Sequence, residues 1–221
     1  MSAHLHVEIE KLKKKIVALT AVVEDAVRKA VKSVDDGNAE LAQQLIDGDT
    51  DIDRTEVDIE EDCLKLLALY QPVATDLRFI VAVLKINNDV ERVGDLAVNI
   101  AERALFLCTQ EPIDVPFDFA EMRRKTLAML RDSLGALMNM DARLARQVRA
   151  LDDEVDEINR EMYLKIGQAV RKNPHHIERL LSYLSASRHL ERIADYATNI
   201  AEDVIYLIEG QIVRHKPTFP T

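Results

Sequence analysis

Acidic side chains recur four residues apart in two stretches of the chain that are 100 residues apart. The first stretch, Glu91–Glu102, reads Glu-Arg-Val-Gly-Asp-Leu-Ala-Val-Asn-Ile-Ala-Glu, and Glu191–Glu202 repeats eight of its twelve residues. An α-helix advances about 100° per residue, so Glu91 and Asp95 share one face, roughly 40° apart. Like charges at this spacing cost about 0.2–0.5 kcal/mol per pair in a helix. Because both stretches carry this cost, the pattern indicates that something positive neutralises the acidic face.

A second pair of acids is also duplicated, with an offset of 103 residues in the sequence. Oxygen-only clusters suit hard or borderline cations such as iron, manganese, magnesium, calcium or, less typically, zinc. If the pairs on neighbouring helices converge, each half of the chain offers a patch of four carboxylates. The predicted metal ligands are Asp49, Asp53, Glu91 and Asp95 in the first patch, and Asp152, Asp156, Glu191 and Asp195 in the second. Flanking side chains could extend both patches: Glu56, Glu60, Asn99 and Glu102 in the first, and Asn159, Asn199 and Glu202 in the second.

The elements that carry these acids are predicted to be long amphipathic helices. Apolar residues recur every three or four positions over 5–34, 39–70, 75–110, 119–139, 141–172 and 176–209. Asn38 and Asp141 are expected to cap the second and fifth helices, and Gly48 to bend the second. Pro72 and Pro174 should end those two helices, because the residue before a proline is driven out of the α conformation.

The second half of the chain therefore repeats the first. We divide the chain into a three-helix repeat over 1–110, a linker over 111–118 with two prolines, a second repeat over 119–210 and an irregular tail over 211–221. Long helices joined by short links pack as up-down bundles. The predicted fold is all-α, with six long helices arranged as two pseudo-symmetric three-helix bundles.

The net charge and the distribution of apolar residues argue against binding to nucleic acid and to membranes. A net charge of −10 argues against binding to nucleic acid or to an anionic membrane surface. No signal peptide is recognisable, and no apolar run approaches the ~20 residues that span a bilayer. We therefore expect a soluble cytoplasmic protein that does not insert into membranes.

Several alternatives to a metal site stay open. Acids are common on solvated helix faces, and these could instead pair with Arg54, Arg92, Arg188 or Arg192, although surface ion pairs add little stability. A di-iron oxidase needs Glu-x-x-His on two helices, and the chain has no such motif. A metal-dependent phosphohydrolase with a carboxylate-bound cluster and a metal-free helical adaptor are the remaining alternatives. No Gly-rich phosphate loop or nucleophile elbow is present in the sequence.

Together these residues resemble the PhoU family of bacterial phosphate-uptake regulators. The resemblance covers nearly the whole chain and rests on the two duplicated stretches, the second extending to Tyr206, and on Gln71-Pro-Val-Ala-Thr-Asp-Leu-Arg-Phe79. It implies two three-helix bundles with approximate internal two-fold symmetry. It also implies that the eight acids named above hold multinuclear clusters of iron or zinc at the surface. One departure is that Gly94 in the first stretch corresponds to Ala194 in the second.

The resemblance further implies signalling rather than catalysis. Similar proteins act with the ATPase subunit of the high-affinity phosphate importer and with a membrane sensor histidine kinase. They repress the phosphate-starvation response when phosphate is plentiful. We therefore expect a non-catalytic metal-binding regulator with these two partners, and we expect it to form a homodimer.

Overall fold

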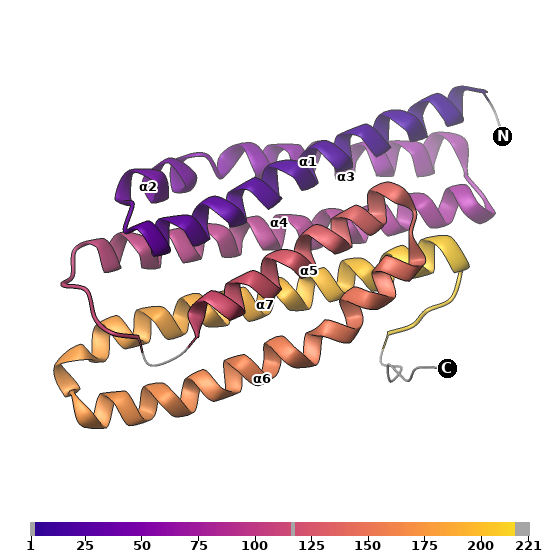
Figure 1. Cartoon of the computed structure of the whole chain (residues 1–221). Helices are drawn as coiled ribbons and strands as arrows, with labels where there is room; N and C mark the ends of the chain where they lie inside the picture. Colours follow the sequence, from indigo (N-terminus) through magenta and orange to yellow (C-terminus); the bar gives the residue numbers. More distant parts are fainter. Residues whose placement is uncertain (1–2, 116–117, 215–221) are drawn as a thin grey trace.

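The computed structural model describes residues 3–115 and 118–214, and these are almost entirely helical (Figure 1). The helices are α1 (Ala3–Asp36), α2 (Ala39–Asp47), α3 (Thr50–Tyr70), α4 (Ala74–Cys108), α5 (Phe119–Asn139), α6 (Ala142–Lys172) and α7 (Ile177–Glu209). Each of the six predicted helices is present, and the second is divided at Gly48 and Asp49 into α2 and α3. The predicted all-α fold is confirmed. None of the described helices is long and apolar enough to cross a bilayer.

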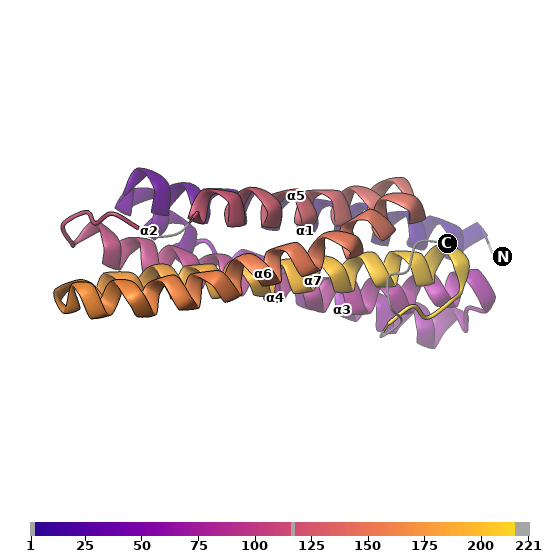
Figure 2. The same ribbon diagram turned by 60° about the horizontal axis from the view of Figure 1, so that its bottom comes forward.

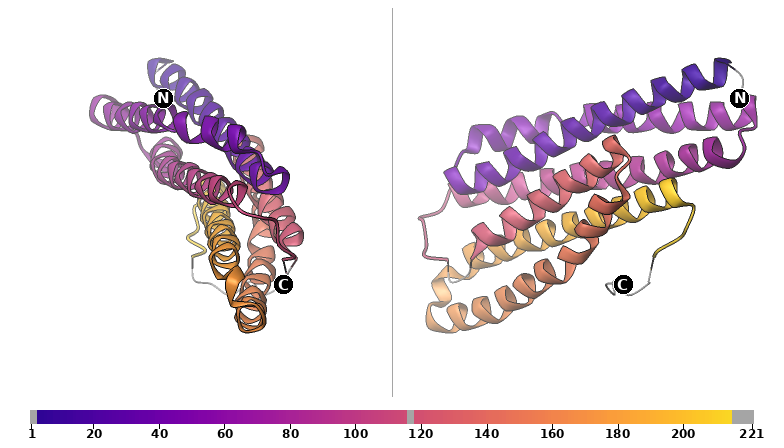
Figure 3. Two further views of the ribbon diagram at one scale, coloured as in Figure 1. Left: turned by 90° about the vertical axis from the view of Figure 1, so that its left-hand side faces the viewer. Right: turned by 45° about the vertical axis from the view of Figure 1, so that its right-hand side comes forward.

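The two halves of the chain meet along α4 and α7, which lie side by side and run in opposite directions (Figure 1). Helices α1, α2 and α3 pack against α4, while α5 and α6 pack against α7. Helix α1 also contacts α5, so these two lie together on one side of the α4–α7 pair (Figure 2). The end-on view in Figure 3 shows the first half stacked on the second, with the helices along one common direction.

An apolar stripe explains why α1 forms and which way it faces. Leu12, Ile16, Leu19, Val23 and Val27 recur every three or four residues, and each is at most 2% exposed. This spacing places them on one side of a helix, where burial of each large side chain stabilises the fold by about 1.5–3 kcal/mol. The same periodicity continues in α4 and α7, which are buried along most of their length because they are covered from both halves.

The predicted helix ends are largely confirmed. The Asn38 side chain accepts a hydrogen bond from the Leu41 amide, and the Asp141 side chain accepts from the amides of residues 143 and 144. Helix α3 ends at Tyr70, and Gln71 after it takes the left-handed conformation with φ of 46°. Two boundaries differ slightly, since α4 already ends at Cys108 and α7 follows a short 3-10 helix, Pro174–His176.

The predicted linker and tail are non-helical where they are described. Residues 111–115 and residue 118 connect the halves without helical structure, and residues 210–214 follow α7 in the same way. Residues 116–117 of the predicted linker and 215–221 of the predicted tail lie outside the described residues.

Candidate metal sites

Three acids of the first half converge where α3 begins against the middle of α4. Asp49 directly precedes α3, Asp53 lies in its first turn, and Asp95 lies on α4. One carboxylate oxygen of each can be chosen so that all three lie within 4.8 Å of one another. Oxygens on opposite sides of a cation with bonds of about 2.3–2.6 Å are separated by a similar distance. The three side chains are therefore placed to share one ion.

The position of Asp49 follows from the break between α2 and α3. The amide of Gly48 bonds to the Leu45 carbonyl and closes α2, and the Asp49 carbonyl then accepts from the Ile52 amide to start α3. The Asp49 side chain makes no capping hydrogen bond, and its Oδ1 is buried without a hydrogen-bond partner among the described residues. A buried acceptor without a partner costs free energy. A bound cation would satisfy it.

Electrostatics of the first patch agree with this arrangement. Burial raises the pKa of Asp49, and the neighbouring charges of Asp53 and Asp95 raise it further. Burial and then the charge of Asp95 likewise raise the pKa of Glu91. In both residues the surroundings disfavour the charged carboxylate. A bound cation would favour the charged form instead.

Glu91, the fourth predicted ligand, lies beside these three acids but outside their closest group. Its Oε2 lies 3.4 Å from Nε of Arg92, and Nη1 of the same arginine lies 3.2 Å from Oδ2 of Asp95. The predicted alternative of arginine pairing is thus present at the edge of this patch, where the Arg92 side chain is half exposed. Arg54 instead pairs with Asp51, on the exposed side of α3.

The second patch also brings its four predicted ligands into one neighbourhood. Burial raises the pKa of Asp195 to about 7, with further increases from the charges of Glu191, Asp152 and Asp156. Burial and then the charge of Asp156 raise the pKa of Glu191. The acids of α6 therefore face those of α7, as the repeat predicts.

This second patch is looser than the first. In the described parts of the chain, one group of three acids brings one ligand atom of each residue within 4.8 Å of the others. This group is Asp49, Asp53 and Asp95 of the first patch. In the second half, Oδ1 of Asp152 accepts a hydrogen bond of 3.1 Å from the Thr198 hydroxyl, which satisfies part of that carboxylate. Helix α6 also runs without a break through Asp152.

Three partly buried hydrogen bonds beside the patches were not predicted from the sequence. Nδ2 of Asn87 on α4 donates to the carbonyl oxygen and Oε1 of Glu56 on α3, at 2.9 and 3.1 Å. At the corresponding place in the second half, the Ser187 hydroxyl donates to Oδ1 of Asn159 at 3.1 Å. The two sequence offsets, 100 and 103, relate these residues and could have revealed the pairing. Each bond ties the two acid-bearing helices of its half together.

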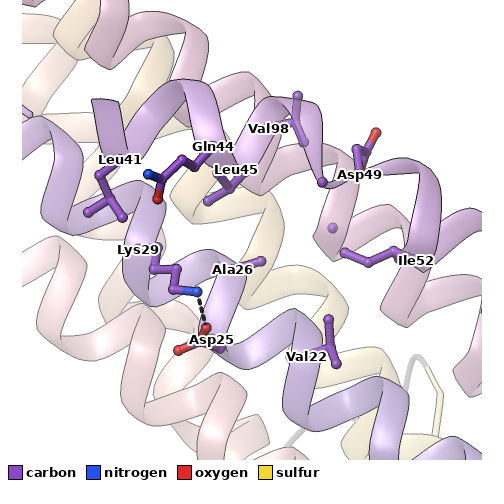
Figure 4. A pocket seen from close by; sticks show the side chains of 12 residues that line it. Val22, Asp25, Ala26, Lys29, Leu41, Gln44, Leu45, Asp49, Ile52 and Val98 are labelled. Atoms are coloured by element: carbon purple, nitrogen blue, oxygen red, sulfur yellow. Dashed lines mark ion pairs between the residues drawn. The ribbon is translucent and has the colours of Figure 1, made fainter. Parts of the chain in front are cut away.

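A pocket of about 160 Å³ lies beside Asp49, between α1, α2, α3 and α4 (Figure 4). Lys29 and Asp25 form an ion pair of 2.7 Å on its α1 wall, and Ile52 and Gly94 line the opposite side. Asp49 lies at its edge (Figure 4). The pocket is open to solvent and gives a route to the Asp49 side of the first patch.

Comparisons with known proteins agree with the duplicated architecture. The model of the PhoU domain matches the chain twice, over residues 16–104 and 119–204. The chain belongs to the PhoU family. The two matches each include one of the duplicated acidic stretches.

Relatives of the PhoU family match along nearly their whole length. A phosphate-specific transport system accessory protein PhoU homolog of Aquifex aeolicus is 40% identical over 209 residues, which is 95% of each chain. Its counterpart in Pseudomonas aeruginosa is 37% identical and covers 97% of this chain and 89% of its own.

Two crystal structures of PhoU proteins resemble the fold. PhoU from Pseudomonas aeruginosa has a TM-score of 0.89 at 35% identity, covering 93% of this chain and 99% of its own. The phosphate transport system regulatory protein PhoU from Streptococcus pneumoniae has a TM-score of 0.83 at 29% identity, covering 95% and 99%.

Proposed function

We propose that this protein is a non-catalytic, metal-binding regulator of phosphate uptake. Its relatives are named accessory proteins of a phosphate-specific transport system, and one of similar structure is named a regulatory protein. The observation that carries the metal-binding part is the convergence of Asp49, Asp53 and Asp95 around a buried, unpartnered oxygen of Asp49.

The residues of both patches fit a bound metal. The donors are all carboxylate oxygens, which hard and borderline cations prefer. In the first patch Asp49, Asp53 and Asp95 would hold the ion, with Glu91 beside them. Asp152, Asp156, Glu191 and Asp195 would form the second patch. A multinuclear iron or zinc centre would supply positive charge that neutralises these acids.

Bound metal would act on partner docking through the exposed rim of each patch. Asp53 is solvent-exposed and Asp95 is partly exposed. Asp195 keeps an exposed side, although the surrounding protein desolvates its carboxylate enough to raise its pKa, so a partner surface can reach all three. Without a cation, the negative charges of these acids repel any acidic partner surface. With a cation, the same rim becomes neutral and its shape is fixed. The partners we propose are the importer ATPase subunit and the sensor histidine kinase.

In this role the protein represses the phosphate-starvation response while phosphate is plentiful, as a cytoplasmic homodimer. The carboxylates bind and position the cation but need not react with a substrate. A phosphohydrolase would instead turn over phosphate esters when loaded with metal. An assay of the loaded protein with a chromogenic phosphate ester separates the two functions, and sustained turnover would contradict the non-catalytic proposal.

A pull-down tests the docking proposal directly. The tagged protein is incubated with the importer ATPase subunit and, separately, with the kinase, in iron or zinc and in chelator. We expect capture in metal and at least about a tenfold loss in chelator or with Asp49→Asn and Asp53→Asn combined. Asp51→Asn is the matched control, because this neighbouring acid is exposed to solvent and pairs with Arg54 rather than with the patch. Capture that ignores both chelator and the double substitution would exclude metal-dependent docking.

A further inference from the structure

Asp203, near the end of α7, is the one charged residue of the described chain that is buried. Its side chain is 2% exposed and forms an ion pair with Lys85 of α4. Nη2 of Arg214 lies 3.2 and 3.3 Å from its two carboxylate oxygens. Asp203 lies eight residues after Asp195 on α7 and is not one of the eight predicted metal ligands.

Arg214 reaches Asp203 because the chain turns back after α7. Gly210 has φ of 70°, a left-handed conformation that ends the helix and redirects the backbone. We call the residues that follow, Gln211–Arg214, the C-terminal strap (yellow in Figure 1). The strap has no helical structure, and its Ile212 is 66% exposed.

Few polar contacts fasten the strap to the helices. Besides Asp203, Arg214 reaches Oε2 of Glu202 at 3.9 Å, and Nη2 of Arg149 donates to the Val213 carbonyl at 3.4 Å. Arg214 thus makes most of these polar contacts, and Val213 adds apolar packing against the core. A segment held in this way opens at low free-energy cost compared with the helices.

The strap covers a pocket without filling it. A space of about 240 Å³ remains between the strap and the two central helices. Val81, Lys85 and Tyr206 form the helical wall, with Asp203 and Glu202 at one end, and the strap contributes Ile212 and Val213. The wall thus offers apolar surface next to carboxylates, which suits an occupant with branched apolar side chains beside an arginine.

Release of Arg214 would not leave the buried Asp203 carboxylate without an ion-pair partner. Asp203 would keep its ion pair with Lys85, and Glu202 would keep Nε of Arg149 at 3.1 Å. An unpaired buried charge is what makes most buried ion pairs costly to open. Here the arginine is one of two partners, so another arginine can replace it while the site stays neutralised.

We propose that this pocket between α4 and α7 is a docking site for an extended segment of a partner protein in which an arginine follows two β-branched residues. The C-terminal strap occupies the site in cis, and the partner segment displaces it. The guanidinium would bond to Asp203 and Glu202 as Arg214 does, since its planar donors match carboxylates.

A peptide that copies the strap tests the site without knowledge of the partner. Fluorescent Gly-Gln-Ile-Val-Arg, the sequence of residues 210–214, is titrated into the full chain and followed by anisotropy. We expect Arg214→Ala to bind it about tenfold more tightly than the wild type, because the competing arginine is gone. Arg143→Ala, which removes an exposed arginine of α6, should bind it like the wild type.

A second peptide, with alanine in place of the arginine, tests the role of the guanidinium without a further change to the protein. It should not bind Arg214→Ala, and Asp203→Asn added to that variant should abolish binding of the first peptide. Equal binding of both peptides, or no binding of the first to Arg214→Ala, would overturn the proposal. Exchange of the strap between two copies of the chain would give a dimer that Arg214→Ala dissociates in light scattering, and that outcome would also overturn it.

Discussion

Gly94 of α4 lies so close to Ile52 of α3 that a Cβ at Gly94 would be 3.3 Å from Cγ2 of Ile52. The corresponding residues in the second half are Ala194 and Val155, and both are buried. One half therefore combines glycine with isoleucine, and the other combines alanine with valine. The two combinations contain the same number of side-chain carbons, so the volume beside each acidic patch is conserved.

This relationship predicts how substitutions at the two positions combine. Gly94→Ala gains about 1 kcal/mol of helix propensity but forces Ile52 to move, and such overpacking costs about 1–3 kcal/mol. We expect a net loss on the order of 1 kcal/mol in urea denaturation. Adding Ile52→Val should make the double variant more stable than Gly94→Ala alone, although Ile52→Val by itself costs about 0.5–1.5 kcal/mol. Simple additivity of the two changes would refute the proposed compensation.

Asp49→Asn should separate metal binding from stability. The substitution removes a predicted ligand and also removes a charge that burial, Asp53 and Asp95 all disfavour. We expect metal affinity to fall by more than about tenfold, while the chelated protein unfolds at an equal or higher temperature. Metal content by elemental analysis and thermal denaturation measure the two effects. Unchanged metal content would remove Asp49 from the ligands.

The metal-free protein should become less stable as pH rises through about 7. Asp195 has a folded-state pKa raised to about 7, by burial first and then by Glu191. The folded chain therefore holds this proton at pH values where the unfolded chain, with an ordinary Asp pKa of about 3.9, has lost it. Protonation stabilises the fold at low pH, and this contribution is lost as pH rises through the folded-state pKa.

Thermal denaturation in chelator at pH 6 and pH 8 measures this effect. Other groups titrate in the same range, and burial followed by the charge of Asp203 raises the pKa of Asp89 to about 6. The informative quantity is therefore the difference between the wild type and Asp195→Asn, which should be smaller at pH 6 than at pH 8. An equal difference at both pH values would show that Asp195 does not titrate there.

Lys85 and Asp203 should respond unequally to substitution. The Lys85 side chain is 38% exposed, whereas that of Asp203 is 2% exposed. Lys85→Met leaves a buried carboxylate with Arg214 as its remaining cation, and we expect a loss of about 1–3 kcal/mol in the free energy of unfolding. Asp203→Asn leaves two cations that water can reach, so its cost should be smaller. Urea denaturation of both variants decides the order.

The sequence predicted the helices and the faces that carry the acids, because both follow from periodicity within one element. Asn38 and Asp141 were recognised as caps for the same reason, since a cap bonds to amides two or three residues away. The repeat added the inference that the pairs on adjacent helices meet. These features depend on local geometry or on the duplication itself.

The burial of individual atoms, and contacts between residues far apart in the sequence, were not predicted. Nothing in the spacing of Asp49 and Asp152 distinguishes them, yet only Asp49 has a buried oxygen without a partner among the described residues. Burial lowers the pKa of His189, and the charges of Arg192 and of Arg103 on α4 lower it further, an influence of one half on the other that spacing does not predict. The strap was predicted only as an irregular tail, because its arginine finds Asp203 through the turn at Gly210.

The helix break before Asp49 has no counterpart before Asp152, which lies within the unbroken α6. If both patches bind metal as proposed, they should differ in affinity, since Asp49, Asp53 and Asp95 are already close together and the acids of the second patch are less so. Metal should then bind the two patches in two stages, at different concentrations of free metal ion. Calorimetric titration would resolve the two stages. One interrupted helix in a repeated fold would then let a single polypeptide respond to two different metal concentrations.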